Sequence, residues 1–207
     1  PNSLVYLMDE DTGKATWNTY DDMADDWTAP FFSDASKTVA PDARFSSKYG
    51  TRFKKSMPAP VITLPEPFIK VEKVPATTEE EDRYAVKIAP NRDINRIELY
   101  ADKSIKFKNM TVNGKAASNL QPGVSRLNVF SLRWRDRLLE YYPVNRDTLR
   151  LEMSMEKGQH PEVTLYEAAY SLLNEPQLKL KPRDEDMIPR PFVLNDAVVV
   201  KRSFVLK

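Results

Sequence analysis

From residue 59 onward, the chain consists largely of short stretches in which apolar and charged residues alternate. The clearest are FIKVEKV at 68–74, RYAVKIA at 83–89 and SIKFKNMTV at 104–112. Successive side chains of a strand point to opposite faces of a sheet, so this period of two predicts strands with one face in the core and the other in water. An Asn-Gly pair in VNGK at 112–115 predicts a tight hairpin turn.

Prolines divide the chain into short elements. The 207 residues include 16 prolines and only 5 glycines, and proline is excluded from helix interiors and central strands. Further strand-like runs lie at 95–101, 124–134, 138–142, 148–156, 162–170 and 196–206. About ten short strands, one short helix and no alternation of strands with long helices predict an all-β fold, an antiparallel β-sandwich.

The loop after the first apolar run is the densest acidic cluster that resembles a site. It contains three consecutive acids from Asp9 to Asp11, followed by Gly13. A calcium loop of the EF-hand type needs a glycine at its sixth position and a bidentate glutamate at its twelfth. Counted from Asp9, these positions hold Lys14 and Tyr20. Asp, Thr and Gly are turn residues, so the loop predicts a hairpin turn and no metal site.

The first 58 residues are expected to form a hairpin, a short helix and a loop. Strands at 3–8 and 15–20 form the hairpin. Asp21 is placed to cap the helix, which should end just before Pro30. The polar stretch at 34–60 should cross the surface as an extended segment. The sequence therefore predicts an extension packed on a main β-sandwich domain, with the bounds 1–58 and 59–207.

Composition narrows the chemistry that the chain can carry. Lysine and arginine number 31 against 30 aspartates and glutamates, so the net charge is +1 and no global field attracts nucleic acid or an anionic membrane. There is no cysteine, and the single histidine, His160, precedes a proline in a predicted turn. Nucleophilic triads and zinc hydrolase sites therefore lack their usual residues. Four carboxylates on predicted strands are expected on the wet face: Glu98, Glu140, Glu152 and Glu167. We predict no catalytic residue, metal ligand or cofactor site.

Two basic segments contain aromatic residues and predict contacts with a partner or a membrane surface. They are RFSSKYGTRFKK at 44–55 and RWRDR at 133–137. Nucleic acid is not expected as a partner, because the total charge is balanced. Tryptophans could instead form a sugar-stacking platform, which gives the alternative of a carbohydrate- or peptide-binding module. The candidate contact residues are Trp17, Trp27, Arg44, Lys48, Arg52 and Trp134.

Both ends of the chain carry a more specific pattern. The opening segment at 1–28 runs from Asn-Ser-Leu through an Asp-rich turn to a tryptophan and a later Asp-x-Trp-Thr. The closing segment at 181–206, with Ile188, Pro189, Asp196 and Lys201 among its matched positions, follows a second pattern. Together they resemble the C-terminal soluble domain of multi-spanning M28-family zinc peptidases, a group with bacterial aminopeptidase-like members and the fungal vacuolar membrane protease.

The resemblance implies a domain without catalytic residues. In the family the zinc-binding peptidase domain lies N-terminal to the membrane helices, and none of its ligands maps onto this chain. Zinc would therefore belong to the parent protein. The implied role is an accessory domain, extracytoplasmic (periplasmic or lumenal) and tethered through the parent membrane protein. Its implied partners are the peptidase domain and membrane region of the same polypeptide, and it would pack against or gate that peptidase domain.

Overall fold

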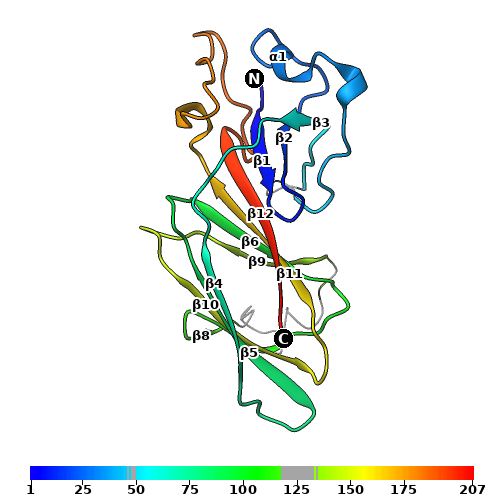
Figure 1. Ribbon diagram of the computed structural model, residues 1–207, viewed down its shortest axis with the longest axis vertical. Coiled ribbons are helices and arrows are strands. Elements are labelled where there is room, and N and C mark those ends of the chain that lie inside the picture. The colour runs from blue at the N-terminus through cyan, green and yellow to red at the C-terminus, as the bar shows by residue number, and fades with distance from the viewer. Residues whose placement is uncertain (46, 48–49, 118–132, 134) are drawn as a thin grey trace, which may run out of the picture. The chain divides into compact units, whose positions relative to one another are not determined.

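The computed structural model describes residues 1–45, 47, 50–117, 133 and 135–207 (Figure 1). It contains a seven-stranded sheet in the order β3-β2-β1-β12-β11-β6-β9 and a five-stranded sheet in the order β4-β5-β10-β7-β8. The described helical segments are α1 (Ala29–Phe32), η1 (Ala35–Lys37) and η2 (Leu172–Asn174). The all-β sandwich predicted from the alternating pattern is therefore confirmed.

The chain forms two compact units, each assembled from two separate segments. The first contains Pro1–Thr63 and Tyr166–Arg202, and the second contains Leu64–Leu165 and Ser203–Lys207. The sequence had suggested a single division between residues 58 and 59. The structure instead groups the segment 166–202 with the N-terminal residues.

The first unit is organised by a parallel pairing between strands from opposite ends of the chain. The register pairs Val5 with Ala197 and Asp9 with Lys201, and the two strands lie side by side in Figure 1. β1 also forms the predicted antiparallel hairpin with β2. The strands of this unit, some of which continue into the second, are β1 (Val5–Asp9), β2 (Lys14–Thr19), β3 (Lys55–Ala59), β11 (Glu162–Ala169) and β12 (Ala197–Val205).

The second unit contains the five-stranded sheet with the clearest alternation. In β5, Tyr84, Val86 and Ile88 are buried, and the residues between them are half-buried. The register of β5 with β10 runs without a break from Ile88↔Leu149 to Glu81↔Glu156. The strands that lie wholly within this unit are β4 (Phe68–Val74), β5 (Glu81–Ala89), β6 (Arg96–Tyr100), β7 (Lys108–Val112), β8 (Lys115–Ala116), β9 (Arg137–Tyr141) and β10 (Leu149–Glu156).

The helix after the first hairpin is displaced from its predicted position. Residues 21–28 form bends and turns, and α1 begins at Ala29 with Pro30 in its first turn. Proline is tolerated there because the N–H that it lacks would have no partner within the helix. The carboxylate of Asp21 accepts hydrogen bonds from Ser3 and so does not cap a helix.

The segment expected to be wholly extended at 34–60 is more structured than predicted. It contains η1 and the edge strand β3, which pairs with β2 from Lys55↔Thr19 to Ala59↔Ala15. The strand predicted at 124–134 lies outside the described residues apart from Arg133. The Asn-Gly turn is confirmed: Asn113 and Gly114 both have positive φ, at 48° and 77°, between β7 and β8.

Candidate functional site

Residues from the two ends of the chain meet around the buried side chain of Asn2. The Asn2 N–H donates to the carbonyl of Ile188 at 3.1 Å, and the N–H of Arg190 donates to the carbonyl of Asn2 at 2.7 Å. The Asn2 amide nitrogen donates to Asp25 Oδ2 at 2.7 Å, and its amide oxygen accepts from Arg183 Nε at 2.5 Å. Its backbone and its amide oxygen therefore join the first residues to the segment 183–190, and its amide nitrogen joins them to Asp25.

Arg183 is the central cation of this arrangement. Its two terminal nitrogens donate to the two carboxylate oxygens of Asp196 at 2.6 and 2.5 Å. The guanidinium also lies over the Trp27 ring, 4.2 Å from its centroid, and the Trp27 indole donates to the carbonyl of Lys181 at 3.0 Å. We call Asn2, Asp25, Trp27, Arg183 and Asp196 the terminal lock.

Burial and hydrogen bonding oppose one another at Asp25. Burial disfavours the charged carboxylate, but hydrogen bonds from Asn2 and Thr28 outweigh that effect and hold the pKa of Asp25 below its usual range. Asp21 lies nearby in the same unit, where it accepts from Ser3 at 2.6 Å and from Arg190 at 2.7 Å. Hydrogen bonds of Asn2 and Asp21 thus connect the opening segment to Arg183 and Arg190 of the closing segment.

The acidic loop at the tip of the first hairpin is the predicted turn. Gly13 has φ of 69° and donates its N–H to the carbonyl of Asp9 at 2.8 Å. The Asp9 carboxylate accepts from the N–H groups of Asp11 and Thr12 at 3.0 and 3.3 Å. Across the described residues, no group of three or more His, Asp or Glu side chains is arranged to hold a metal ion.

A cleft of about 490 Å³ lies beside this hairpin in the first unit. Lys201 in its lining lies between two carboxylates, with Nζ 3.5 Å from Asp9 Oδ2 and 3.3 Å from Asp42 Oδ2. Its apolar lining includes Leu7, Ala15, Val39, Ala40, Pro58, Ala59 and Val61. The volume falls in the range of known ligand pockets, and apolar walls with a few charged groups suit an amphipathic peptide side chain. We call it the hairpin cleft.

Asp42 is held ionised inside the hairpin cleft. Burial raises the cost of its charge, but the N–H of Phe45 and the Tyr166 hydroxyl, 2.9 and 2.8 Å away, donate to the carboxylate. With the Lys201 ammonium, these groups hold the pKa of Asp42 below its usual range. The cleft therefore contains an ion cluster of the Asp9 and Asp42 carboxylates and the Lys201 ammonium, from residues separated widely in sequence. Sequence reasoning identified Asp9 as a turn residue and missed the ion cluster.

The structure buries two of the six predicted contact residues. Trp17 and Trp27 are buried, 6% and 9% exposed, and Trp17 packs edge-on against Tyr6 with ring centroids 5.3 Å apart. Neither ring is available for stacking on a sugar. Arg44 and Arg52 lie on the surface. Lys48 and Trp134 are outside the described residues.

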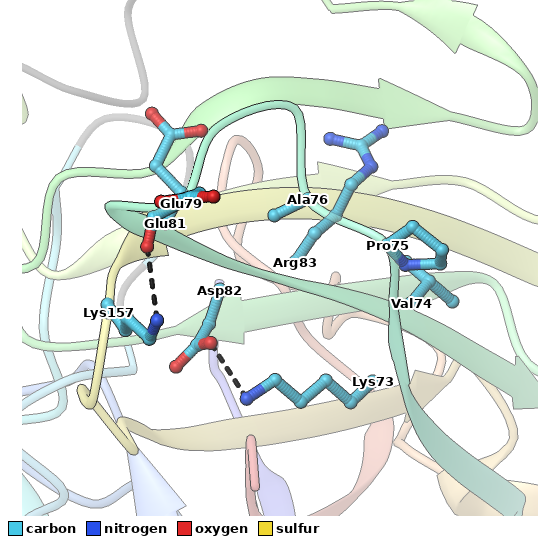
Figure 2. Close-up of a pocket in the computed structure, with 9 residues that line it drawn as sticks. All are labelled: Lys73, Val74, Pro75, Ala76, Glu79, Glu81, Asp82, Arg83 and Lys157. Carbon is cyan, nitrogen blue, oxygen red and sulfur yellow. Dashed lines mark hydrogen bonds and ion pairs between the residues drawn. The ribbon is translucent and has the colours of Figure 1, made fainter.

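A second cleft, of about 460 Å³, lies at the connection between β4 and β5 (Figure 2). Lys73 Nζ lies 2.7 Å from Asp82 Oδ1 and holds the pKa of this carboxyl below its usual range. Lys157 donates to the carbonyl of Glu79 at 3.2 Å, and the N–H of Gly158 donates to Asp82 at 2.9 Å. The Asp82 side chain is buried and is paired with Lys73 and the N–H of Gly158.

Three of the four strand carboxylates, Glu98, Glu140 and Glu152, pair with arginine. Glu98 is bonded to Arg96, and both are buried on β6, although alternation had predicted a wet face there. Arg137 lies 3.1 Å from Glu140 on β9. Opposite charges neutralise one another, which allows β6 to be covered on both faces. Other groups have local partners: Arg83 pairs with Glu152, and His160 with the carbonyl of Leu206.

No protein-family model matches the chain, and the curated proteins contain no match to it. The likeness of its two ends to M28-type peptidases therefore rests on the sequence patterns. Among the described residues, no helix has the length and apolar character needed to cross a membrane.

Proposed function

We propose that the chain is a non-catalytic accessory domain of a multi-spanning M28-type zinc peptidase, held on the extracytoplasmic side and packed against or gating the peptidase domain of its own polypeptide. The terminal lock is the observation that carries this proposal. Asn2, Trp27 and Asp196 belong to the patterns that resemble the family, and all three serve the scaffold of the first unit. Residues that maintain a fold are those a family of non-catalytic domains would share.

The hairpin cleft supports a role in binding a protein segment. Its lining combines apolar residues with the ion cluster of Asp9, Asp42 and Lys201, a combination that suits a peptide side chain with a polar end. Val61 on its rim is 59% exposed. This same cleft favours the second candidate function, a peptide-binding module of an exported protein. The carbohydrate version of that alternative is weaker, because the rings of Trp17 and Trp27 are buried.

Reading the parent coding sequence upstream of Pro1 tests the proposal directly. A region with the histidines and carboxylates of a zinc peptidase, followed by several spans of ~20 apolar residues, is the expected result. A signal peptide immediately upstream would overturn the accessory role and leave the peptide-binding module in first place. Peptidase turnover by the chain itself in the presence of zinc, abolished by a chelator, would overturn the non-catalytic assignment.

A binding experiment then tests the role of the hairpin cleft. The upstream peptidase region is produced separately and titrated with the chain and with the variant Val61→Asp. Val144→Asp is the matched control, since Val144 is 64% exposed in the second unit. We expect the first variant to weaken binding and the control to leave it unchanged. Equal binding by all three proteins would exclude the cleft as the contact surface.

A further inference from the structure

Strand β4 leaves a long, regular edge open in the second unit. It is the terminal strand of the five-stranded sheet, and its seven residues pair with β5 without interruption from Phe68↔Ala89 to Val74↔Arg83. Within the described parts of the chain, no strand pairs with its other side. An open edge presents unpaired N–H and C=O groups that can bind another strand.

The register of the sheet identifies which residues point to this edge. Lys157 donates its N–H to the carbonyl of Glu80, so the even-numbered residues of β5 bond toward β10 and the odd-numbered ones toward β4. Because β4 pairs Phe68 with Ala89, its even-numbered residues bond to β5. The backbone groups of Ile69, Val71 and Lys73 therefore face outward.

Two other edge strands, β3 and β8, have features that hinder pairing with a further strand. On β3, the N–H of Val39 bonds to the outward carbonyl of Ser56 at 3.0 Å, and Pro58 has no N–H to donate. Strand β8 has only two residues, Lys115 and Ala116. β4 has neither protection. Its side chains are charged, but the order of the charges allows opposite charges to face one another when two copies of β4 pair antiparallel.

The charges of β4 select one register for antiparallel pairing with a copy of itself. Lys70 and Glu72 lie on one face of the strand, and Lys70 Nζ is 2.7 Å from Glu72 Oε1. The Lys70 side chain is 52% exposed and the Glu72 side chain 55%. A two-fold axis at Val71 places Lys70 of each copy opposite Glu72 of the other. An axis at Lys70 or at Glu72 would place like charges opposite one another, which is unfavourable.

We propose that β4 pairs antiparallel with β4 of a second copy of this chain about a two-fold axis at Val71. Val71 pairs with Val71, and Ile69 with Lys73, through the outward backbone groups. Ile69 and Val71 are only half-buried in the single chain, and the pairing covers them further. The contact is isologous, and as a single-strand edge it is smaller than a standard interface of about 1,600 Å², so the dimer is weak.

A charge-exchange experiment tests this pairing. Sedimentation equilibrium from low micromolar to near-millimolar concentration gives the dimer dissociation constant of the chain and of Lys70→Glu and Glu72→Lys. Each variant places like charges opposite one another in both cross-strand pairs, so we expect the dissociation constant to rise about tenfold or more. Mixed together, the two variants have opposite charges at both positions and should form a heterodimer. Matched controls are Lys181→Glu and Glu185→Lys, which change the same charges at exposed positions of the first unit.

A backbone variant gives a second, independent test. Val71→Pro removes an outward N–H while leaving the ladder with β5 intact, so the folded chain should persist and the dimer should be lost. A wild-type chain that stays monomeric over the whole range would overturn the proposal. So would a dimer that both charge variants leave unchanged, or variants that fail to associate when mixed. Thermal unfolding of each variant confirms that the charge changes have not altered the fold.

Discussion

Replacing Arg183 with methionine should destabilise the first unit because it leaves the terminal lock without its cation. The guanidinium makes two charge-assisted bonds to Asp196 and one to Asn2, and its side chain is 8% exposed. Methionine keeps an apolar chain of similar length against Trp27. The change therefore isolates the polar contribution from the packing contribution.

The structure sets the size of the expected effect. Removing one member of a buried ion pair costs about 3–5 kcal/mol. The Asp196 side chain is 23% exposed, so water screens the carboxylate that remains, and we expect the lower end, about 3 kcal/mol. Arg183→Lys should recover only part of this loss, because an ammonium cannot form the two parallel bonds of a guanidinium.

Urea unfolding followed by tryptophan fluorescence and circular dichroism measures the loss. Arg150→Met is the control, since Arg150 is exposed on β10, and we expect it to change the free energy of unfolding by less than about 0.5 kcal/mol. Asp196→Asn completes a double-mutant cycle, and asparagine tolerates the positive φ of 52° at this position. A loss for Arg183→Met no greater than that of the control, or strictly additive losses in the cycle, would refute the lock as a coupled unit.

Three further changes test other parts of the fold. Because hydrogen bonds and Lys201 outweigh burial and lower the pKa of Asp42, its contribution to stability is present above the unfolded pKa of about 3.9 and is lost as pH falls through the folded pKa. Urea unfolding at neutral and acidic pH should show a smaller acid loss for Asp42→Asn, and equal losses would contradict this. Gly114→Ala should lower the free energy of unfolding by about 1 kcal/mol. The cause is the φ of 77° alone, since nothing lies within 4 Å of the added carbon. A thermal midpoint equal to that of the wild type would contradict this prediction. Arg96→Met should lower the free energy of unfolding by about 3–5 kcal/mol, measured with urea, because it leaves Glu98 buried without this partner. Adding Glu98→Gln should recover part of that loss, and a double variant whose loss is the sum of the two single losses would contradict the reasoning.

Local patterns predicted the strands of the second unit well, because their alternation reflects one buried and one wet face. β4 begins and ends where predicted, at Phe68 and Val74, and β5 extends by two residues beyond the predicted run at 83–89. The same rule failed on β6, where Arg96 and Glu98 are buried together. A period of two shows which residues share a face but not whether their charges find partners that allow burial.

The helix and the candidate site required information that single positions do not carry. Asp21 has the chemistry of a helix cap, but tertiary hydrogen bonds from Ser3 hold its carboxylate elsewhere. The ion cluster of the hairpin cleft joins Asp9, Asp42 and Lys201, which lie far apart in the sequence. Their proximity depends on the parallel pairing of β1 with β12, and nothing in either strand alone specifies that pairing.

The terminal lock and the hairpin cleft are connected through the register of β12. Asp196, held by Arg183, immediately precedes this strand, and its own N–H donates to the carbonyl of Leu4 at 3.1 Å. These contacts fix where β12 begins against β1, and that start places Lys201 opposite Asp9 five residues later. A slip of one residue would turn Lys201 to the other face of the sheet and remove the cation from the cleft. By fixing the register that assembles the cleft, the lock residues would act on the binding proposed there without touching the bound segment.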